Sequence, residues 1–357
     1  MHGLSSEHGA SLESGRVTVR PFVDGDAANW DELVAQCSEA TFFHRIGWRA
    51  VISESFGHRC HYMVAERGNK MSGILPLCEI RSRLFGHSLV SLPFAVYGGP
   101  AAFDEQSARA LITTAEELAQ QLGVSHLELR NREPRCPDWP RQSLYVTFRK
   151  RIDRDPDVNM KNIPRKQRAM VRKGARAGLG CQIDTTVDRF FALYSDNVHR
   201  HGTPPFSRSY FAHLKTTFGE ACEILTIVDR AGRPVSGVLS FYFRDEVLPY
   251  YAGDTLAARD LAANDFKYWQ LLLRATGRGA AVFDFGRSKR GTGSYDFKSN
   301  WGFDPSPLYY EFRLLKGSSV PENNPLNPKY AALIALWRRL PRPVVNALGP
   351  KIIRNLG

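Results

Sequence analysis

Residues 280–303, AAVFDFGRSKRGTGSYDFKSNWGF, place a strand, a basic glycine-rich loop and a helix in direct succession. The apolar run 280–286 is typical of a buried strand, and a helix is expected from Ser294. Backbone N–H groups and the helix dipole at such a junction favour an anion. We therefore expect the loop to bind a phosphorylated substrate or carrier, through Arg287, Lys289, Gly291 and Gly293; a basic surface loop is the alternative.

Two ionisable side chains flank this loop. Asp284 lies between two phenylalanines in the strand, where an unpaired carboxylate is costly to bury. It is expected to pair with a basic residue such as Arg287 or to act directly in catalysis. Lys298 follows the loop and can stabilise a developing oxyanion or hold a substrate phosphate. A solvated helix lysine is the alternative for Lys298, and Lys298 and Asp284 are the candidate catalytic residues.

Several other chemistries find no support in the sequence. The GxxxxGK[ST] spacing of P-loop enzymes is absent, and the GxSxG turn of serine hydrolases is absent too. Arg287 stands one residue too early for the RxxGxG spacing of a CoA pyrophosphate loop. The six cysteines form no CxxC pair, and the HxH motif at His199 and His201 lacks a third ligand, so no metal is expected.

The two halves of the chain share the order β-α-α-β-β-β-α-β, which indicates a tandem duplication of α/β domains with three layers and mixed sheets. Each domain is long enough to enclose its own core. We expect the following division: a loose tail at 1–15, a first domain at 16–150, a linker at 151–163, a second domain at 164–315 and a basic tail at 316–357.

The net charge of +12 is concentrated in two segments that contain no acidic residue. They are residues 158–182 and 323–357. In the first, Arg165, Arg168 and Arg172 recur at helical spacing and form a basic stripe. Like charges at that spacing repel each other, so the stripe indicates an anionic partner; a solvated helix face is the alternative.

The second basic segment is expected to form two short helices, at 329–340 and 344–356, separated by prolines. A basic amphipathic segment of this kind lies on an anionic membrane surface or docks on its own domain, and the sequence leaves both open. The N-terminal residues lack the apolar region of a secretory signal, and no window of 18 apolar residues occurs. We expect a cytoplasmic protein, with peripheral contact at the inner membrane face.

Four stretches bear a resemblance to a known family: IPRKQRAMVRKGARAGL (163–179), NVHRHGTPPFS (197–207), PYYAGDTLAARDLAANDFKYW (249–269) and FDFGRSKRGTGSYDFKSNWGF (283–303). SLPFAVYGGPAAF (91–103) also fits. The sequence resembles the Fem-type (FemAB-like) aminoacyl transferases, and more narrowly the Fem-like proteins associated with exosortase/PEP-CTERM systems. The resemblance covers roughly residues 17–315.

This resemblance implies two tandem acetyltransferase-like (GNAT-like) domains that transfer an acyl group to an amine of a peptidoglycan or exopolysaccharide precursor. Lys298 matches the family's FK lysine, which contacts the substrate and stabilises the reaction centre. Arg200 and Tyr251, with Tyr250 as a rival for the tyrosine, match the acceptor-binding residues. Tyr97, Gly98 and Gly99 are expected in the cleft wall. The long coiled-coil insertion of typical cell-wall members is absent.

The resemblance implies no permanently bound cofactor, because the acyl donor is a co-substrate, either aminoacyl-tRNA or acyl-CoA. A nucleotide- or lipid-linked glycan or peptide precursor is the expected acceptor. Two other functions stay open at this point. One is an acyl-CoA-dependent N-acetyltransferase, and the other is a non-catalytic module that binds phosphorylated glycan or nucleic acid through the basic stripe.

Overall fold

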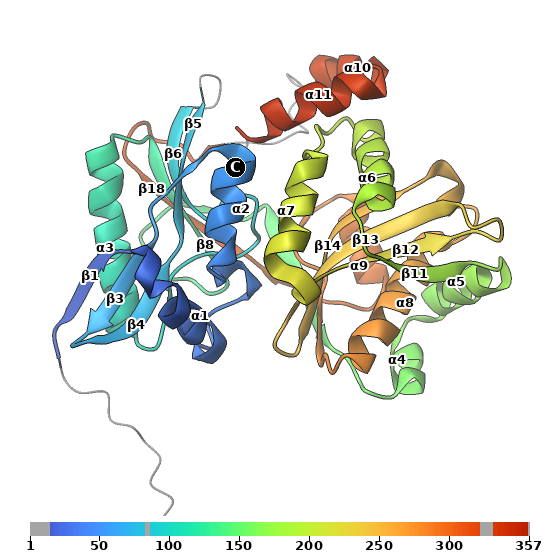
Figure 1. Cartoon of the computed structure of the whole chain (residues 1–357), viewed down its shortest axis with the longest axis horizontal. Coiled ribbons are helices and arrows are strands. Elements are labelled where there is room, and N and C mark those ends of the chain that lie inside the picture. Colours follow the sequence, from blue (N-terminus) through green and yellow to red (C-terminus); the bar gives the residue numbers. More distant parts are fainter. Residues whose placement is uncertain (1–14, 83–85, 322–330, 356–357) are drawn as a thin grey trace, which may run out of the picture.

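The computed structural model describes residues 15–82, 86–321 and 331–355. Two α/β halves lie side by side along the longest axis of the molecule (Figure 1). The predicted loose tail at 1–15 lies almost wholly outside the described residues, as does the start of the helix expected from residue 329. No helix within the described ranges is long and apolar enough to cross a membrane.

The first half contains two sheets and three main helices. The four-stranded sheet has the order β1 (Val17–Pro21), β3 (Met63–Arg67), β4 (Lys70–Leu75), β7 (Ala101–Ala102). The six-stranded sheet has the order β2 (Arg59–Cys60), β5 (Leu77–Ser82), β6 (Gly86–Ser91), β8 (His126–Asn131), β18 (Tyr309–Leu314), β9 (Arg141–Gln142). The helices are α1 (Ala27–Gln36), α2 (Gly47–Phe56) and α3 (Glu105–Leu122).

The second half is built on one sheet with the order β11 (Gly180–Asp184), β12 (Cys222–Val228), β13 (Pro234–Phe243), β14 (Glu246–Asp254), β15 (Val282–Asp284), β10 (Tyr145–Arg151), β16 (Ser288–Lys289). A further strand, β17 (Pro305–Pro307), pairs with β10. Its helices are α4 (Pro156–Asn162), α5 (Arg165–Arg176), α6 (Asp188–Arg200), α7 (Arg208–Phe218), α8 (Ala263–Gly277) and α9 (Gly293–Asn300). The mixed α/β fold expected from the sequence is confirmed.

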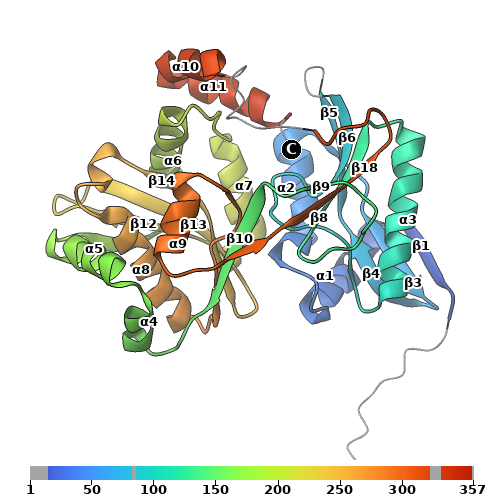
Figure 2. The same ribbon diagram turned by 180° about the vertical axis from the view of Figure 1, so that it is seen from behind.

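Each half contains one parallel strand pair that brackets a long helix: β6 with β8 around α3, and β14 with β15 around α8. The next strand beside each parallel pair comes from the other half of the chain. Strand β10 pairs with β15. Strand β18 pairs with β8 (Figure 2). The division at 16–150 and 164–315 stays a proposal. Strand β10 comes at the end of the first range but belongs to the sheet of the second half, and β18 comes at the end of the second range but belongs to a sheet of the first half.

The local sequence explains where several helices begin and end. The Asp104 carboxylate accepts the Ser107 N–H at 2.8 Å and caps α3, which ends at Gly123 with φ +63°. The Ser207 hydroxyl accepts the Tyr210 N–H at 3.0 Å and caps α7. These short-range signals fix the helices that cover the sheets.

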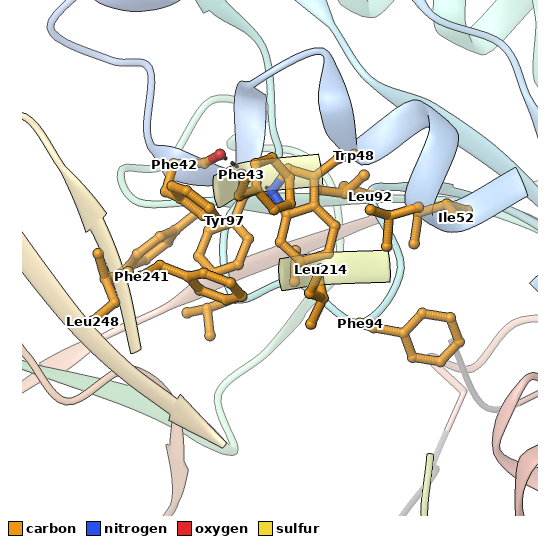
Figure 3. Packing of buried hydrophobic residues seen from close by; sticks show 14 of the residues in the cluster. Phe42, Phe43, Trp48, Ile52, Leu92, Phe94, Tyr97, Leu214, Phe241 and Leu248 are labelled. Atoms are coloured by element: carbon orange, nitrogen blue, oxygen red, sulfur yellow. Dashed lines mark hydrogen bonds between the residues drawn. The ribbon is translucent and has the colours of Figure 1, made fainter. Parts of the chain in front are cut away.

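One aromatic-rich core connects the two halves. Phe42, Phe43, Trp48 and Tyr97 of the first half pack with Phe241 of β13 in the second (Figure 3). The rings of Phe42 and Phe241 are stacked with their centroids 4.3 Å apart. Because large buried rings contribute several kcal/mol of hydrophobic stabilisation between them, the halves are held together as one body.

The C-terminal tail docks on the protein. Its helices are α10 (Ala331–Arg339) and α11 (Arg342–Ile353). Two residues of α6 contact the tail. The His199 ring contacts the Trp337 carbonyl at 3.0 Å, and Asp196 pairs with Arg342. At the far end, the His58 ring contacts the Arg354 carbonyl at 2.8 Å. The tail therefore contacts both halves along one edge of the molecule (Figure 1).

Candidate active site

Strands β14 and β15 part in the middle of the second sheet. They pair only at Glu246 with Val282 and at Val247 with Phe283. Beyond this point β14 continues to Asp254, while β15 ends at Asp284. In open α/β sheets, ligands bind beyond the carboxyl ends of parallel strands. The opening between these two strand ends is therefore the place in the second half where a substrate is expected.

The β14 strand also carries a bulge at this opening. Leu239 of β13 faces Tyr251, whereas the next residue, Ser240, faces Pro249, so Tyr250 is the extra residue. A bulge bends the strand and redirects the side chains around it. The Tyr250 hydroxyl donates to the Phe94 carbonyl of the first half at 2.7 Å. The Tyr251 hydroxyl lies 2.8 Å from that of Tyr210.

Asp284 is fully buried and accepts hydrogen bonds from both halves of the protein. Its Oδ2 accepts the Tyr97 hydroxyl at 2.8 Å, and its Oδ1 accepts the Gly286 N–H at 2.7 Å. The Thr147 hydroxyl donates to Oδ1 at 3.1 Å. Its cationic partner is Arg149 of β10, with Nε at 3.1 Å. The expected pairing with Arg287 is therefore replaced by one with Arg149, because the β10 strand lies directly beside β15.

The Lys298 ammonium is held by one turn of backbone. Its Nζ donates to the carbonyls of Phe285 at 2.7 Å, Gly286 at 3.0 Å and Arg287 at 3.2 Å. An ammonium has three protons, so this turn occupies its donor capacity. Burial lowers the pKa of Lys298 to about 7, and the charge of Asp284 opposes that shift. Lys298 thereby fixes the turn that leads from β15 into the glycine-rich loop.

Arg287 is a partly buried cation that has no carboxylate within ion-pair distance in the described part of the chain. Its guanidinium lies over the Tyr145 ring at 4.7 Å and donates to the Tyr310 hydroxyl at 3.3 Å. Arginine readily holds carboxylates and phosphates through two parallel hydrogen bonds. Its side chain is the best-placed cation at this opening for an anionic substrate group.

The glycine-rich loop contains a short strand and an internal hydrogen bond. Lys289 belongs to β16, which pairs with β10, and Thr292 donates to the Lys289 carbonyl at 2.7 Å. Gly291 has φ +72°, a conformation that side chains rarely adopt. A side chain at either Gly291 or Gly293 would meet no atom within 4 Å, so this part of the loop borders open space.

Arg200 lies at the end of α6, beside the end of β14. It donates to the Asp254 carbonyl and to Asn197 Oδ1, and its Nε is 3.3 Å from Asp196. Arg200 therefore belongs to the same edge as the opening, where one of its terminal nitrogens donates to the protein.

The predicted basic helix is present as α5, but it lies apart from this group. Arg165 and Arg172 are exposed, and Arg168 donates to the Lys161 carbonyl at 3.4 Å. The helix packs on α8 and lies at the end of the molecule away from the first half (Figures 1 and 2). The α5 arginines therefore lie on a different helix from Lys298 and outside the turn that follows Asp284.

Two buried features at the opening escaped the sequence analysis. Lys267 of α8 is fully buried, and its Nζ contacts Asp254 Oδ1 at 2.9 Å. A lysine within an otherwise apolar helix face was the available signal. In addition, Leu92 and Phe94 have φ of +50° and +64°, although bulky residues rarely adopt positive φ. Backbone strain of this kind is often found at functional sites.

The strained segment ends at the expected cleft-wall residues, and these line a cavity of about 210 Å³. Tyr97, Gly98 and Gly99 form one side of it, and Arg132 lies over the Tyr97 ring at 5.6 Å. His44 also lines it, but both ring nitrogens are engaged, with Thr41 and the Gly99 carbonyl. Burial lowers the pKa of His44 to about 4, so the ring stays neutral. No group of acids, histidines or cysteines suited to a metal occurs within the described ranges.

Comparison with known proteins agrees with this geometry. Residues 159–299 match the acetyltransferase (GNAT) domain family. FemX is similar in structure, with a TM-score of 0.64 and 14% identity over 82% of this chain and 97% of that one. The C-terminal domain of a protein described as a lysylphosphatidylglycerol synthetase from Agrobacterium fabrum has a TM-score of 0.55 and 15% identity, over 82% and 92%.

A tandem GNAT protein from the clavulanic acid biosynthesis pathway is also similar, with a TM-score of 0.51 and 14% identity over 85% of this chain and 100% of that one. No curated protein gives a significant sequence match. Residues 159–299 therefore match an acetyltransferase (GNAT) domain, and the chain shares the fold of FemX. The matched domain contains both Asp284 and Lys298.

Proposed function

We propose that the protein transfers an acyl or aminoacyl group to an amine on a cell-wall or exopolysaccharide precursor, at the opening between β14 and β15. The observation that carries this proposal is the grouping of Asp284, Lys298 and Arg287 around one turn at the end of β15. Each of the three either fixes that turn or projects from it. An active site needs such rigid support to hold reacting groups in place.

In this proposal Asp284 and Lys298 are positioning residues. Asp284 accepts hydrogen bonds from Tyr97, Thr147 and the Gly286 N–H, and Lys298 donates to three carbonyls of the same turn. Together they hold Arg287 and the start of the glycine-rich loop. Arg287 then binds the anionic group of the donor. The amine attacks the acyl carbonyl and gives an oxyanion, whose collapse breaks the acyl–O bond of tRNA or the acyl–S bond of CoA; the carrier leaves and takes up the proton lost by the amine.

The acceptor side is proposed to lie toward the first half. The Tyr250 hydroxyl reaches the strained segment at Phe94, and Tyr97 connects that segment to Asp284. Arg200 and Tyr251 are proposed to contact the acceptor from the same edge. A precursor whose amine enters between the halves would meet the acyl group above the Phe285–Arg287 turn.

The donor is proposed to be aminoacyl-tRNA or acyl-CoA, bound as a co-substrate. The exposed arginines of α5 support the larger polyanion, and a structural relative named for lysylphosphatidylglycerol synthesis supports an aminoacyl donor and a lipid-linked acceptor. The glycine-rich loop, including Lys289, Gly291 and Gly293, suits the phosphates of either carrier. A precursor in an exosortase/PEP-CTERM system fits the narrower sequence resemblance.

Equilibrium binding of charged tRNA, uncharged tRNA and acetyl-CoA at several salt concentrations tests the donor. A preference for charged over uncharged tRNA would identify an aminoacyl donor, because bulk charge attraction does not distinguish the two. Tight acetyl-CoA binding with equal, salt-sensitive binding of both tRNAs would identify an acyl-CoA donor. If none of the three ligands binds this protein more tightly than it binds a basic control protein, the proposal is contradicted.

We also propose that the outer face of the tail contacts an anionic membrane surface at the cytoplasmic side. Leu336, Val344 and Leu348 are 60%, 38% and 42% exposed, although they lie on docked helices. Arg338 and Arg339 are exposed beside them. An apolar strip flanked by cations is typical of helices that lie in a membrane interface, and such a location would bring the enzyme to a lipid-linked acceptor.

A further inference from the structure

Two cysteines face each other across neighbouring strands of the first half. Cys60 of β2 is paired in register with Cys78 of β5, and their sulfur atoms lie 3.5 Å apart. The next residue pair is hydrogen-bonded, because the His61 N–H donates to the Leu77 carbonyl at 2.7 Å. Cys60 and Cys78 therefore occupy a non-hydrogen-bonded position of an antiparallel pair.

This position suits a disulfide. Opposed residues at non-hydrogen-bonded positions have Cα atoms about 4.5 Å apart, and disulfides span Cα distances from about 4.4 to 6.8 Å. The sulfurs must approach to about 2.05 Å, which rotation of the two side chains can provide. Neither strand needs to shift its register for the bond to form.

The two thiols differ in access and in chemistry. Cys78 is fully buried, whereas Cys60 is partly exposed and lines a surface cavity of about 290 Å³ together with Arg49, Arg59 and His61. The hydrogen bond with Cys78, helped by the charge of Arg49, lowers the pKa of the Cys60 thiol. Burial raises the pKa of Cys78. Reactive thiols are found in such accessible surroundings near positive charge.

We propose that Cys60 and Cys78 form a redox-active dithiol that closes to an intramolecular disulfide with hydrogen peroxide as the oxidant. The Cys60 thiolate attacks the peroxide, giving a sulfenic acid and hydroxide, which takes up a proton to become water. The Cys78 sulfur then attacks the sulfenic sulfur, forms the S–S bond and releases a second water. In total, two thiols and one peroxide give one disulfide and two waters.

The remaining cysteines provide an internal control. Cys37, Cys136 and Cys222 are buried, whereas Cys181 is exposed on β11. A reaction governed by exposure alone would consume Cys181 first. A reaction governed by the paired geometry consumes Cys60 and Cys78 together. The inference is independent of the proposed transfer reaction, because it concerns a strand pair of the first half.

The test uses the full-length reduced protein and one molar equivalent of hydrogen peroxide, followed by alkylation, trypsin digestion without reductant and mass spectrometry. The expected result is the loss of two of the six titratable thiols and a disulfide-linked pair of peptides, residues 60–67 and 71–81. Oxidation of Cys181 with no linked peptide would overturn the proposal.

Two variants separate the roles of the thiols. In Cys78→Ser the Cys60 sulfenic acid should persist and be trapped by dimedone, because its partner sulfur is missing. In Cys60→Ser, Cys78 should stay reduced at the same dose, since it is buried. Equal dimedone labelling of Cys60 in the wild type and in Cys78→Ser would contradict the second step. Cys78→Ala gives the same comparison if the serine variant does not fold.

Discussion

The Tyr97 hydroxyl donates a hydrogen bond to Asp284 Oδ2 at 2.8 Å, across a sequence separation of 187 residues. This contact links the strained segment of the first half to the end of β15 in the second. Burial, together with the charge of Asp284, raises the pKa of Tyr97 well above its ordinary value. The hydroxyl therefore keeps its proton and remains a donor at neutral pH.

Tyr97→Phe should destabilise the protein by about 1.5–3 kcal/mol, because it removes a buried hydrogen bond to a charged acceptor. Tyr250→Phe is the matched control, since the Tyr250 hydroxyl donates to a neutral acceptor, the Phe94 carbonyl, at 2.7 Å. Its cost should be nearer 1 kcal/mol. Urea unfolding measures both, and equal losses would contradict the special role of the contact with Asp284.

Lys298 should impose a pH dependence on stability. Its pKa is about 7 in the folded protein and ordinarily 10.5, so between these values the unfolded chain binds more protons. Its contribution to the free energy of unfolding therefore increases as pH rises from 7 to 10.5, with a slope approaching ~1.4 kcal/mol per pH unit. Lys298→Met should lack this slope. Parallel wild-type and variant stability curves across that range would refute the assignment.

Arg287→Gln should weaken binding of the acyl donor about tenfold or more, a loss of about 1.4 kcal/mol. The effect on stability should be small, because no carboxylate of the described residues loses an ion pair. Arg233→Gln is the matched control, since Arg233 is an exposed arginine of the β12–β13 hairpin, outside the glycine-rich loop. Fluorescence titration with the donor provides the comparison, and equal affinity in both variants would argue against an anion site at Arg287.

Replacing Arg165, Arg168 and Arg172 together by glutamine should reduce the salt dependence of tRNA binding. Loss of three phosphate contacts lowers the slope of log K against log salt by about 2 to 3. The control replaces three arginines of the first half, Arg81, Arg109 and Arg313, and removes the same net charge. An identical change in slope for both triples would mean that only net charge matters.

The tail should confer binding to vesicles that contain phosphatidylglycerol but not to phosphatidylcholine vesicles. A double substitution, Leu336→Asp and Leu348→Asp, should reduce co-sedimentation several-fold, because it places negative charge in the apolar strip. Leu256→Asp is the control, since Leu256 is 76% exposed but lies outside the tail. Unchanged co-sedimentation of the double variant would remove the membrane assignment.

Local signals predicted much of the architecture. The caps at Asp104 and Ser207 follow from residue type and spacing, as does the β12–β13 hairpin. The repeated order of elements predicted a mixed α/β fold, and the fold is confirmed. Each of these features depends on residues that are close together in the sequence.

The exchange of β10 and β18 could not be predicted in the same way. Alternating apolar residues identify a strand, but they do not say which strand will lie beside it. The consequence reaches the site, because β10 carries Thr147 and Arg149, the two neighbours of Asp284 that the sequence did not indicate. Similarly, Lys298 was recognisable, but its acceptors are backbone carbonyls, which leave no mark in the residue types.

Transfer of a labelled acyl group to an amine-bearing cell-wall precursor, by wild type and by Lys298→Ala, tests the central claim most directly. Lys70→Ala is the control, since Lys70 is an exposed lysine at the start of β4 in the first half. Circular dichroism confirms that each variant is folded. We expect transfer by the wild type and the control, and a rate reduced at least about tenfold in Lys298→Ala, because the turn after β15 loses its support. Full turnover by Lys298→Ala would contradict the proposed site.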